Sequence, residues 1–88
     1  MEKHRLKGSE DLPVEELFGQ VLKQFRKEKG LSQEDLCFES GCHRTYISLL
    51  ERGKKSPSLK TIFQLAKALN VEPYEIMARI QELAQRFP

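Results

Sequence analysis

The chain has 88 residues, of which 39% are hydrophobic and 32% are charged, and its formal net charge is +2. A chain of this length has room for one domain with a small core, and no stretch approaches the roughly 20 apolar residues that a membrane-spanning helix needs. The two cysteines are too few for a disulfide framework, and no histidines stand at the spacing of zinc ligands. We therefore expect a cytoplasmic protein with no metal, no cofactor and no membrane contact.

The first helix is predicted to begin after a charged N-terminal segment. Residues 1–12 mix charges of both signs without an apolar period, so we expect a flexible arm there and a single domain over residues 13–88. From Pro13, apolar residues recur at helical spacing as far as Lys29, and Gly30 is the expected stop. The polar residues Lys23, Gln24, Arg26 and Lys27 fall mostly on the opposite side of this helix.

A second, short helix follows with clear signals at both ends. Ser32 is a good N-cap, and Asp35 stands where a capping box has its acid. Gly41 is able to adopt the left-handed backbone conformation that ends a helix. We therefore predict a helix of about two turns between these residues.

The third helix is predicted at residues 44–52, with Gly53 as its stop. Only Gly41 and Cys42 connect it to the second helix, and such a short connection holds two helices at the steep angle of a helix-turn-helix. This geometry needs a small residue where the two helices approach each other and a glycine at the turn. It also needs apolar residues where the third helix meets the core. The residues that meet these needs are Cys37, Gly41, Ile47 and Leu50.

Two further helices complete an all-α fold of five helices, since no strand-like alternation competes. Ser58 caps the fourth helix, which runs to Asn70, and Pro73 begins the fifth, at about residues 73–87. The fifth helix is more apolar than a terminal helix needs to be. Its apolar side chains either only cover the core or also form a twofold dimer, and we favour the dimer. The predicted dimer residues are Tyr74, Met77, Ile80, Leu83, Ala84 and Phe87.

The positive charge of the chain is local. From His43 to Lys60 there are five lysines or arginines against one acid, Glu51, whereas residues 32–40 carry only acids. This distribution is typical of a surface that binds a polyanion, and a solvated basic loop is the alternative.

The sequence resembles the lambda-repressor-like helix-turn-helix family of the Cro, phage repressor and Xre type in three segments. These segments are LSQEDLCFESG, RTYISLLERGKKSPSL and LAKALNV. The resemblance covers about residues 14–80. It implies a transcriptional regulator that binds double-stranded DNA sequence-specifically, with the helix at residues 44–52 in the major groove and a homodimer on a palindromic operator. A finer and weaker similarity is to controller proteins of restriction-modification systems.

Four outward-facing side chains of the third helix are expected at base edges. Arg44 is the leading reader because it can donate two parallel hydrogen bonds to guanine, and its alternative is an ion pair with Glu39. Thr45 meets a base edge or a phosphate, or bonds only the backbone of its own helix. Leu49 meets a thymine methyl group or packs within the protein. The base-contacting set is Arg44, Thr45, Ser48 and Leu49.

Contacts to the DNA backbone are expected from residues on either side of these readers. In the family, Gln33 is where a phosphate contact is made, and His43 either binds phosphate or caps the third helix. Tyr46 borders the backbone or is purely structural, and any single lysine is either a contact or a solubilising charge. The backbone-contacting set is Gln33, His43, Tyr46, Arg52, Lys54, Lys55 and Ser56.

Two other functions compete with this interpretation. An enzyme is not expected, because no nucleophile–base arrangement and no phosphate-binding glycine loop occur in the sequence. A protein-interaction module, such as an antitoxin or adaptor that uses the same fold, remains the alternative. Its protein partner is not indicated by any motif.

Overall fold

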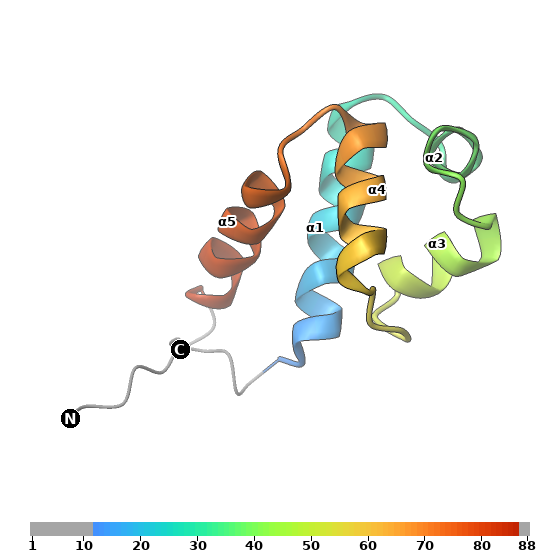
Figure 1. Cartoon of the computed structure of the whole chain (residues 1–88). Coiled ribbons are helices and arrows are strands. Elements are labelled where there is room, and N and C mark those ends of the chain that lie inside the picture. Colours follow the sequence, from blue (N-terminus) through green and yellow to red (C-terminus); the bar gives the residue numbers. More distant parts are fainter. Residues whose placement is uncertain (1–11, 87–88) are drawn as a thin grey trace.

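The computed structural model describes residues 12–86, and five helices pack around one core within that range (Figure 1). The helices α2 and α3 lie at one end of the molecule and α5 at the other, with α1 and α4 between them. The predicted all-α class is therefore confirmed. The helices are α1 Val14–Glu28, α2 Gln33–Ser40, α3 Arg44–Glu51, α4 Leu59–Leu69 and α5 Pro73–Ala84.

Two predicted features lie wholly or mostly outside the described residues. Only Leu12 of the expected N-terminal arm is described, and Phe87 of the expected dimer surface is not. Between residues 12 and 86, no helix has the length and apolar character that crossing a membrane would require.

The ends of α2 form as predicted. The Ser32 hydroxyl accepts a hydrogen bond from the Asp35 backbone N–H at 3.0 Å, and the Asp35 carboxylate accepts one from the Ser32 N–H at 2.9 Å. The pKa of Asp35 is lowered, because hydrogen bonds from the Ser32 backbone N–H and, to a lesser extent, from the Ser32 side chain stabilise its charged carboxylate. At the other end Gly41 is left-handed, with φ 78°. Since a residue with a Cβ rarely adopts this conformation, glycine sets the direction in which the chain enters α3.

Several helices end one to three residues earlier than predicted, and α1, for example, ends at Glu28 rather than at Lys29. α3 stops at Glu51 rather than at Arg52, because the N–H groups of Gly53 and Lys54 turn back to the carbonyls of Leu50 and Leu49 at 3.1 and 2.9 Å. α5 stops at Ala84 rather than near residue 87.

The core contains apolar side chains from all five helices. Ile47 and Leu50 of α3 are fully buried, as predicted, and pack with residues of the other helices. Leu83 and Ala84 are only 8% and 2% exposed. The prediction that these two residues form a dimer surface is therefore wrong, because the core of a single chain already covers them.

A glycine allows α1 to pass unusually close to the end of α3. A Cβ atom at Gly19 would lie 2.4 Å from the carbonyl oxygen of Leu50 and 2.7 Å from that of Glu51. Such distances are far inside van der Waals contact, so only glycine fits without a shift of backbone. Gly19 thus fixes where the C-terminus of α3 sits on α1.

Candidate nucleic-acid interface

The surface at the start of α3 brings together several of the predicted readers. Arg44 and Thr45 are exposed in the first turn, and Ser48 is half-exposed one turn later. Together with Gln33, the first residue of α2, they line a shallow hollow of about 190 Å³. Gln33, which is eleven or more positions from the other three residues, thus joins them in one polar surface with both donors and acceptors.

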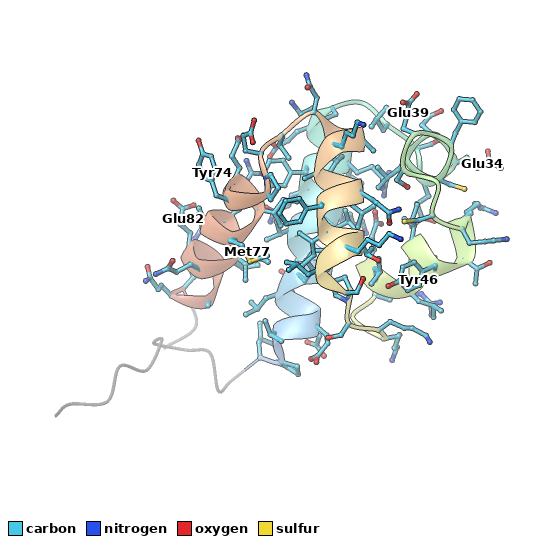
Figure 2. All side chains as sticks on the ribbon, viewed as in Figure 1. Glu34, Glu39, Tyr46, Tyr74, Met77 and Glu82 are labelled. Atoms are coloured by element: carbon cyan, nitrogen blue, oxygen red, sulfur yellow. The ribbon has the colours of Figure 1, made fainter. Side chains whose placement is uncertain are left out.

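Arg44 does not form the ion pair that was its alternative role. Within residues 12–86 the ion pairs are Arg26–Glu51 and Arg79–Glu28, so no bond joins Arg44 to Glu39. Figure 2 shows Glu39 on α2. The guanidinium of Arg44 therefore keeps its hydrogen-bond donors available to a ligand.

His43 occupies the N-cap of α3 without capping it. Its backbone is extended, with φ −67° and ψ 144°, but its side chain makes no cap hydrogen bond. The imidazole is exposed, and the N–H groups of the first turn are left without a side-chain acceptor. The predicted capping role is thus not realised, whereas the geometry suits an anion at this helix end.

The other residues predicted to contact DNA differ in exposure. Tyr46, labelled in Figure 2, is half-buried and packs against the core, so its ring has a structural role whatever its hydroxyl contacts. Leu49 is also half-exposed. After α3, Arg52, Lys54, Lys55 and Ser56 are all exposed, and the Ser56 hydroxyl donates to the Glu15 carboxylate at 3.2 Å.

A buried polar network holds the interface in place, and sequence reasoning missed it. Arg26, predicted on the polar side of α1, is only 8% exposed. Its Nε and Nη2 donate to the two carboxylate oxygens of Glu51 at 2.6 and 3.0 Å, and its Nη1 donates to the Leu31 carbonyl at 2.8 Å. The amide of Gln33 donates to Glu51 as well, at 3.0 Å. The network joins the end of α1, the start of α2 and the end of α3.

A second surface, which is apolar, lies on α4 and α5. Tyr74 and Met77 of α5, both labelled in Figure 2, are 71% and 45% exposed, and Ile80 of the same helix is half-buried. Phe63 of α4 is 55% exposed and lines a hollow together with Pro73 and Glu75 at the start of α5. Periodicity alone does not separate the two roles, because a stripe that meets a neighbouring molecule has the spacing of one that meets the core.

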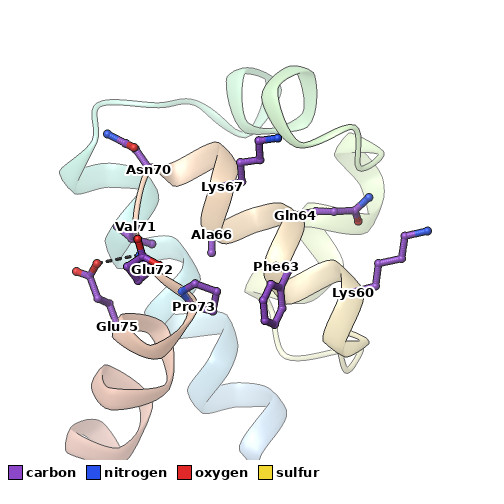
Figure 3. A pocket seen from close by; sticks show the side chains of 10 residues that line it. All are labelled: Lys60, Phe63, Gln64, Ala66, Lys67, Asn70, Val71, Glu72, Pro73 and Glu75. Carbon is purple, nitrogen blue, oxygen red and sulfur yellow. Dashed lines mark hydrogen bonds between the residues drawn. The ribbon is translucent and has the colours of Figure 1, made fainter.

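A hollow of about 630 Å³ lies between α4 and the start of α5 (Figure 3). Phe63 stands on one side of it and Pro73 on the other, while Lys60 and Lys67 project from α4. Its floor is apolar and its rim is charged. The Glu75 carboxylate at that rim accepts a hydrogen bond from the Glu72 N–H at 2.9 Å, which fixes the start of α5.

Comparison with known proteins places this arrangement in a family. A family model described as Helix-turn-helix matches residues 22–76. Control protein C.BamHI of Bacillus amyloliquefaciens is 48% identical over 62 residues, which is 69% of this chain and 76% of that protein. The restriction-modification controller protein C.AhdI of Aeromonas hydrophila superposes with a TM-score of 0.71 at 46% identity, covering 74% of this chain and 98% of that one.

A further solved structure contains nucleic acid. It is the tetramer of the controller protein C.Esp1396I in complex with its natural 35-base-pair operator. This chain matches it with a TM-score of 0.77 at 30% identity, over 83% of this chain and 96% of that one.

Proposed function

Because this chain belongs to the helix-turn-helix family of Xre and Cro type, we propose that it is a transcriptional regulator that binds double-stranded DNA sequence-specifically. In this proposal a homodimer binds a palindromic operator, with one α3 helix of each copy in the major groove. The observation that carries the proposal is the shared polar surface of Gln33, Arg44, Thr45 and Ser48.

Base reading is assigned to the outward side of α3. Arg44, exposed and without an ion pair in the described chain, can donate two hydrogen bonds to O6 and N7 of one guanine, worth about 1–3 kcal/mol of discrimination. The hydroxyls of Thr45 and Ser48 can donate to or accept from base edges. Leu49 offers only apolar contact, which suits the methyl group of thymine.

Contacts to phosphates are assigned to the groups around these readers. The Gln33 amide nitrogen has two hydrogens, and since one is held by Glu51, the other is presented in a fixed direction. His43 is exposed at the start of α3, where the first-turn N–H groups have no side-chain acceptor. Further donors are Tyr46, Arg52, Lys54, Lys55 and Ser56. These contacts add affinity that falls as salt rises, without adding sequence preference.

Dimerisation is assigned to the apolar surface of α4 and α5. Tyr74, Met77 and Ile80 remain from the predicted set, and Phe63 joins them. A twofold dimer would place two α3 helices about one DNA turn (roughly 34 Å) apart. Oligomers on an operator are known for the similar C.Esp1396I, which supports this part of the proposal.

Selection of bound sites from a random DNA library tests the proposal. We expect a palindromic motif, and Arg44→Ala should relax preference at one position in each half-site. Lys54→Ala should instead weaken binding to all sites alike, whereas Lys23→Ala, which removes an exposed cation from α1, should have little effect. A selected motif that is unchanged in Arg44→Ala would show that Arg44 is not a base reader.

The alternative, an antitoxin-like or adaptor module that binds another protein, differs in its response to salt. Binding of random duplex DNA should weaken steeply between two salt concentrations if the exposed cations contact phosphates. Binding that is absent, or that does not change with salt, would favour the interaction module.

A further inference from the structure

A small hollow on the apolar surface has the size and chemistry to hold an aromatic side chain. Its volume is about 180 Å³, roughly six times the ~30 Å³ that one water molecule occupies in the liquid. Its apolar walls come from the first turn of α1, the segment before α4, the first half of α4 and the middle of α5, and they include Val14, Pro57, Ile62, Met77 and Ile80. One carboxylate, that of Glu15, also lines it.

A matching side chain stands nearby on α5 and is not used within the chain. Tyr74 is 71% exposed, although a tyrosine ring is among the side chains that gain most from burial. It lies three residues before Met77, and residues three apart on a helix share a side. Tyr74 is thus next to the hollow on the same surface but does not line it.

We propose that, in the homodimer on which the proposed function rests, Tyr74 of each copy fills this hollow of the other copy. If two α5 helices pair antiparallel with the twofold axis near Met77, residues three positions on either side of it face each other. Tyr74 of one copy then lies opposite Ile80 of the other, which lines the hollow. The contact occurs twice, once in each direction.

The chemistry of the hollow suits a phenol in both of its parts. The ring would meet apolar walls, and the hydroxyl could donate to the Glu15 carboxylate, which already accepts from Ser56 at 3.2 Å. The larger hollow fits less well. Pro73 and Glu75 line it, so a partner's Tyr74 would reach it only if the axis passed near residue 74, which would leave Met77 and Ile80 uncovered.

Sedimentation equilibrium of the full chain without DNA tests the proposal. We expect Tyr74→Ala to raise the dimer dissociation constant at least about 30-fold, as for a central aromatic contact. Tyr74→Phe should raise it roughly 3- to 10-fold through loss of the hydroxyl. Leu59→Ala is the matched control, because Leu59 is 72% exposed and lines neither hollow, and it should change little.

A double-mutant cycle identifies which hollow receives the ring. The effects of Tyr74→Ala and Val14→Ala should be non-additive, because the two side chains touch, whereas those of Tyr74→Ala and Phe63→Ala should add. Val14 and Phe63 are 59% and 55% exposed, so neither change endangers the fold. The reverse pattern would place the ring in the larger hollow and overturn the proposal.

An independent readout uses tyrosine fluorescence, since the chain has two tyrosines and no tryptophan. In Tyr46→Phe, the signal comes from Tyr74 alone, and dimerisation should protect it from acrylamide quenching. A dimer in which Tyr74 stays fully quenchable, or whose affinity Tyr74→Ala leaves unchanged, would refute the contact while leaving the dimer itself intact. A chain that stays monomeric at high micromolar concentration would refute both.

Discussion

Removing one partner of the Arg26–Glu51 pair should destabilise the fold far more than removing a partner of an equally short pair at the surface. The side chains of Arg26 and Glu51 are 10% and 3% exposed, and the two carboxylate oxygens accept three hydrogen bonds. Glu51→Ala leaves a buried guanidinium without its counter-charge, which costs about 3–5 kcal/mol. An 88-residue domain has a total stability of roughly 4–13 kcal/mol, so the loss is a large fraction of it.

The Arg79–Glu28 pair is the matched control. Its N–O distance is also 2.6 Å, but the two side chains are 31% and 54% exposed, so burial is the main variable. Glu28→Ala should therefore lower the free energy of unfolding by no more than about 1 kcal/mol. Arg79 keeps its second contact, 3.8 Å above the ring of Phe25, in that variant.

Urea denaturation followed by circular dichroism measures both changes on one scale. We expect the double variant Arg26→Leu with Glu51→Leu to be less destabilised than Glu51→Ala, because it leaves no uncompensated charge in the interior. Equal losses for Glu51→Ala and Glu28→Ala would show that burial does not determine the cost. Simple additivity of the Arg26 and Glu51 single changes would show that the two residues do not act as a pair.

Two other consequences of the structure can be measured. Gly19→Ala should lower the free energy of unfolding by about 3 kcal/mol, because the new methyl group would meet backbone oxygens of α3 that cannot rotate away as a side chain can. A loss below about 1 kcal/mol in urea denaturation would show that α1 and α3 separate easily. In an NMR titration, the pKa of Asp35 should lie below the ordinary value of an aspartate. Because the pKa is lower in the folded chain, the stability that Asp35 adds is present above the unfolded-state pKa. It is lost as the pH falls through the folded-state pKa. Ser32→Ala should raise the pKa of Asp35 only in part, because the backbone N–H of residue 32 still donates to the carboxylate, and no change would show that the Ser32 hydroxyl does not stabilise the charged form.

The features that could be predicted from the sequence are those that depend on neighbouring residues. Ser32 with Asp35 and Gly41 each determine a helix end through bonds that span a few positions. Asn70, where the fourth helix was predicted to end, also takes the left-handed conformation, with φ 60°. Such local chemistry does not depend on how the helices are packed.

The features that could not be predicted depend on residues far apart in the chain. Arg26 and Glu51 are 25 positions apart, and nothing local shows that an arginine on the polar side of a helix will turn inward to meet a distant acid. The close approach at Gly19 is of the same kind. The assignment of Leu83 to a dimer surface failed for a related reason, since only the packing of α5 decides which part of its apolar stripe stays exposed.

The inward orientation of Glu51 also changes the charge that a polyanion meets. Residues 43–60 carry five cationic side chains and one acid, a formal charge of +4. That acid is neutralised by Arg26, which comes from α1, outside the segment. All five cations of residues 43–60 are thus left without an internal counter-ion from their own segment. Each protomer could then displace up to five counter-ions, and the logarithm of its DNA affinity would fall with the logarithm of salt concentration at a slope of at most about −4.5 from this segment.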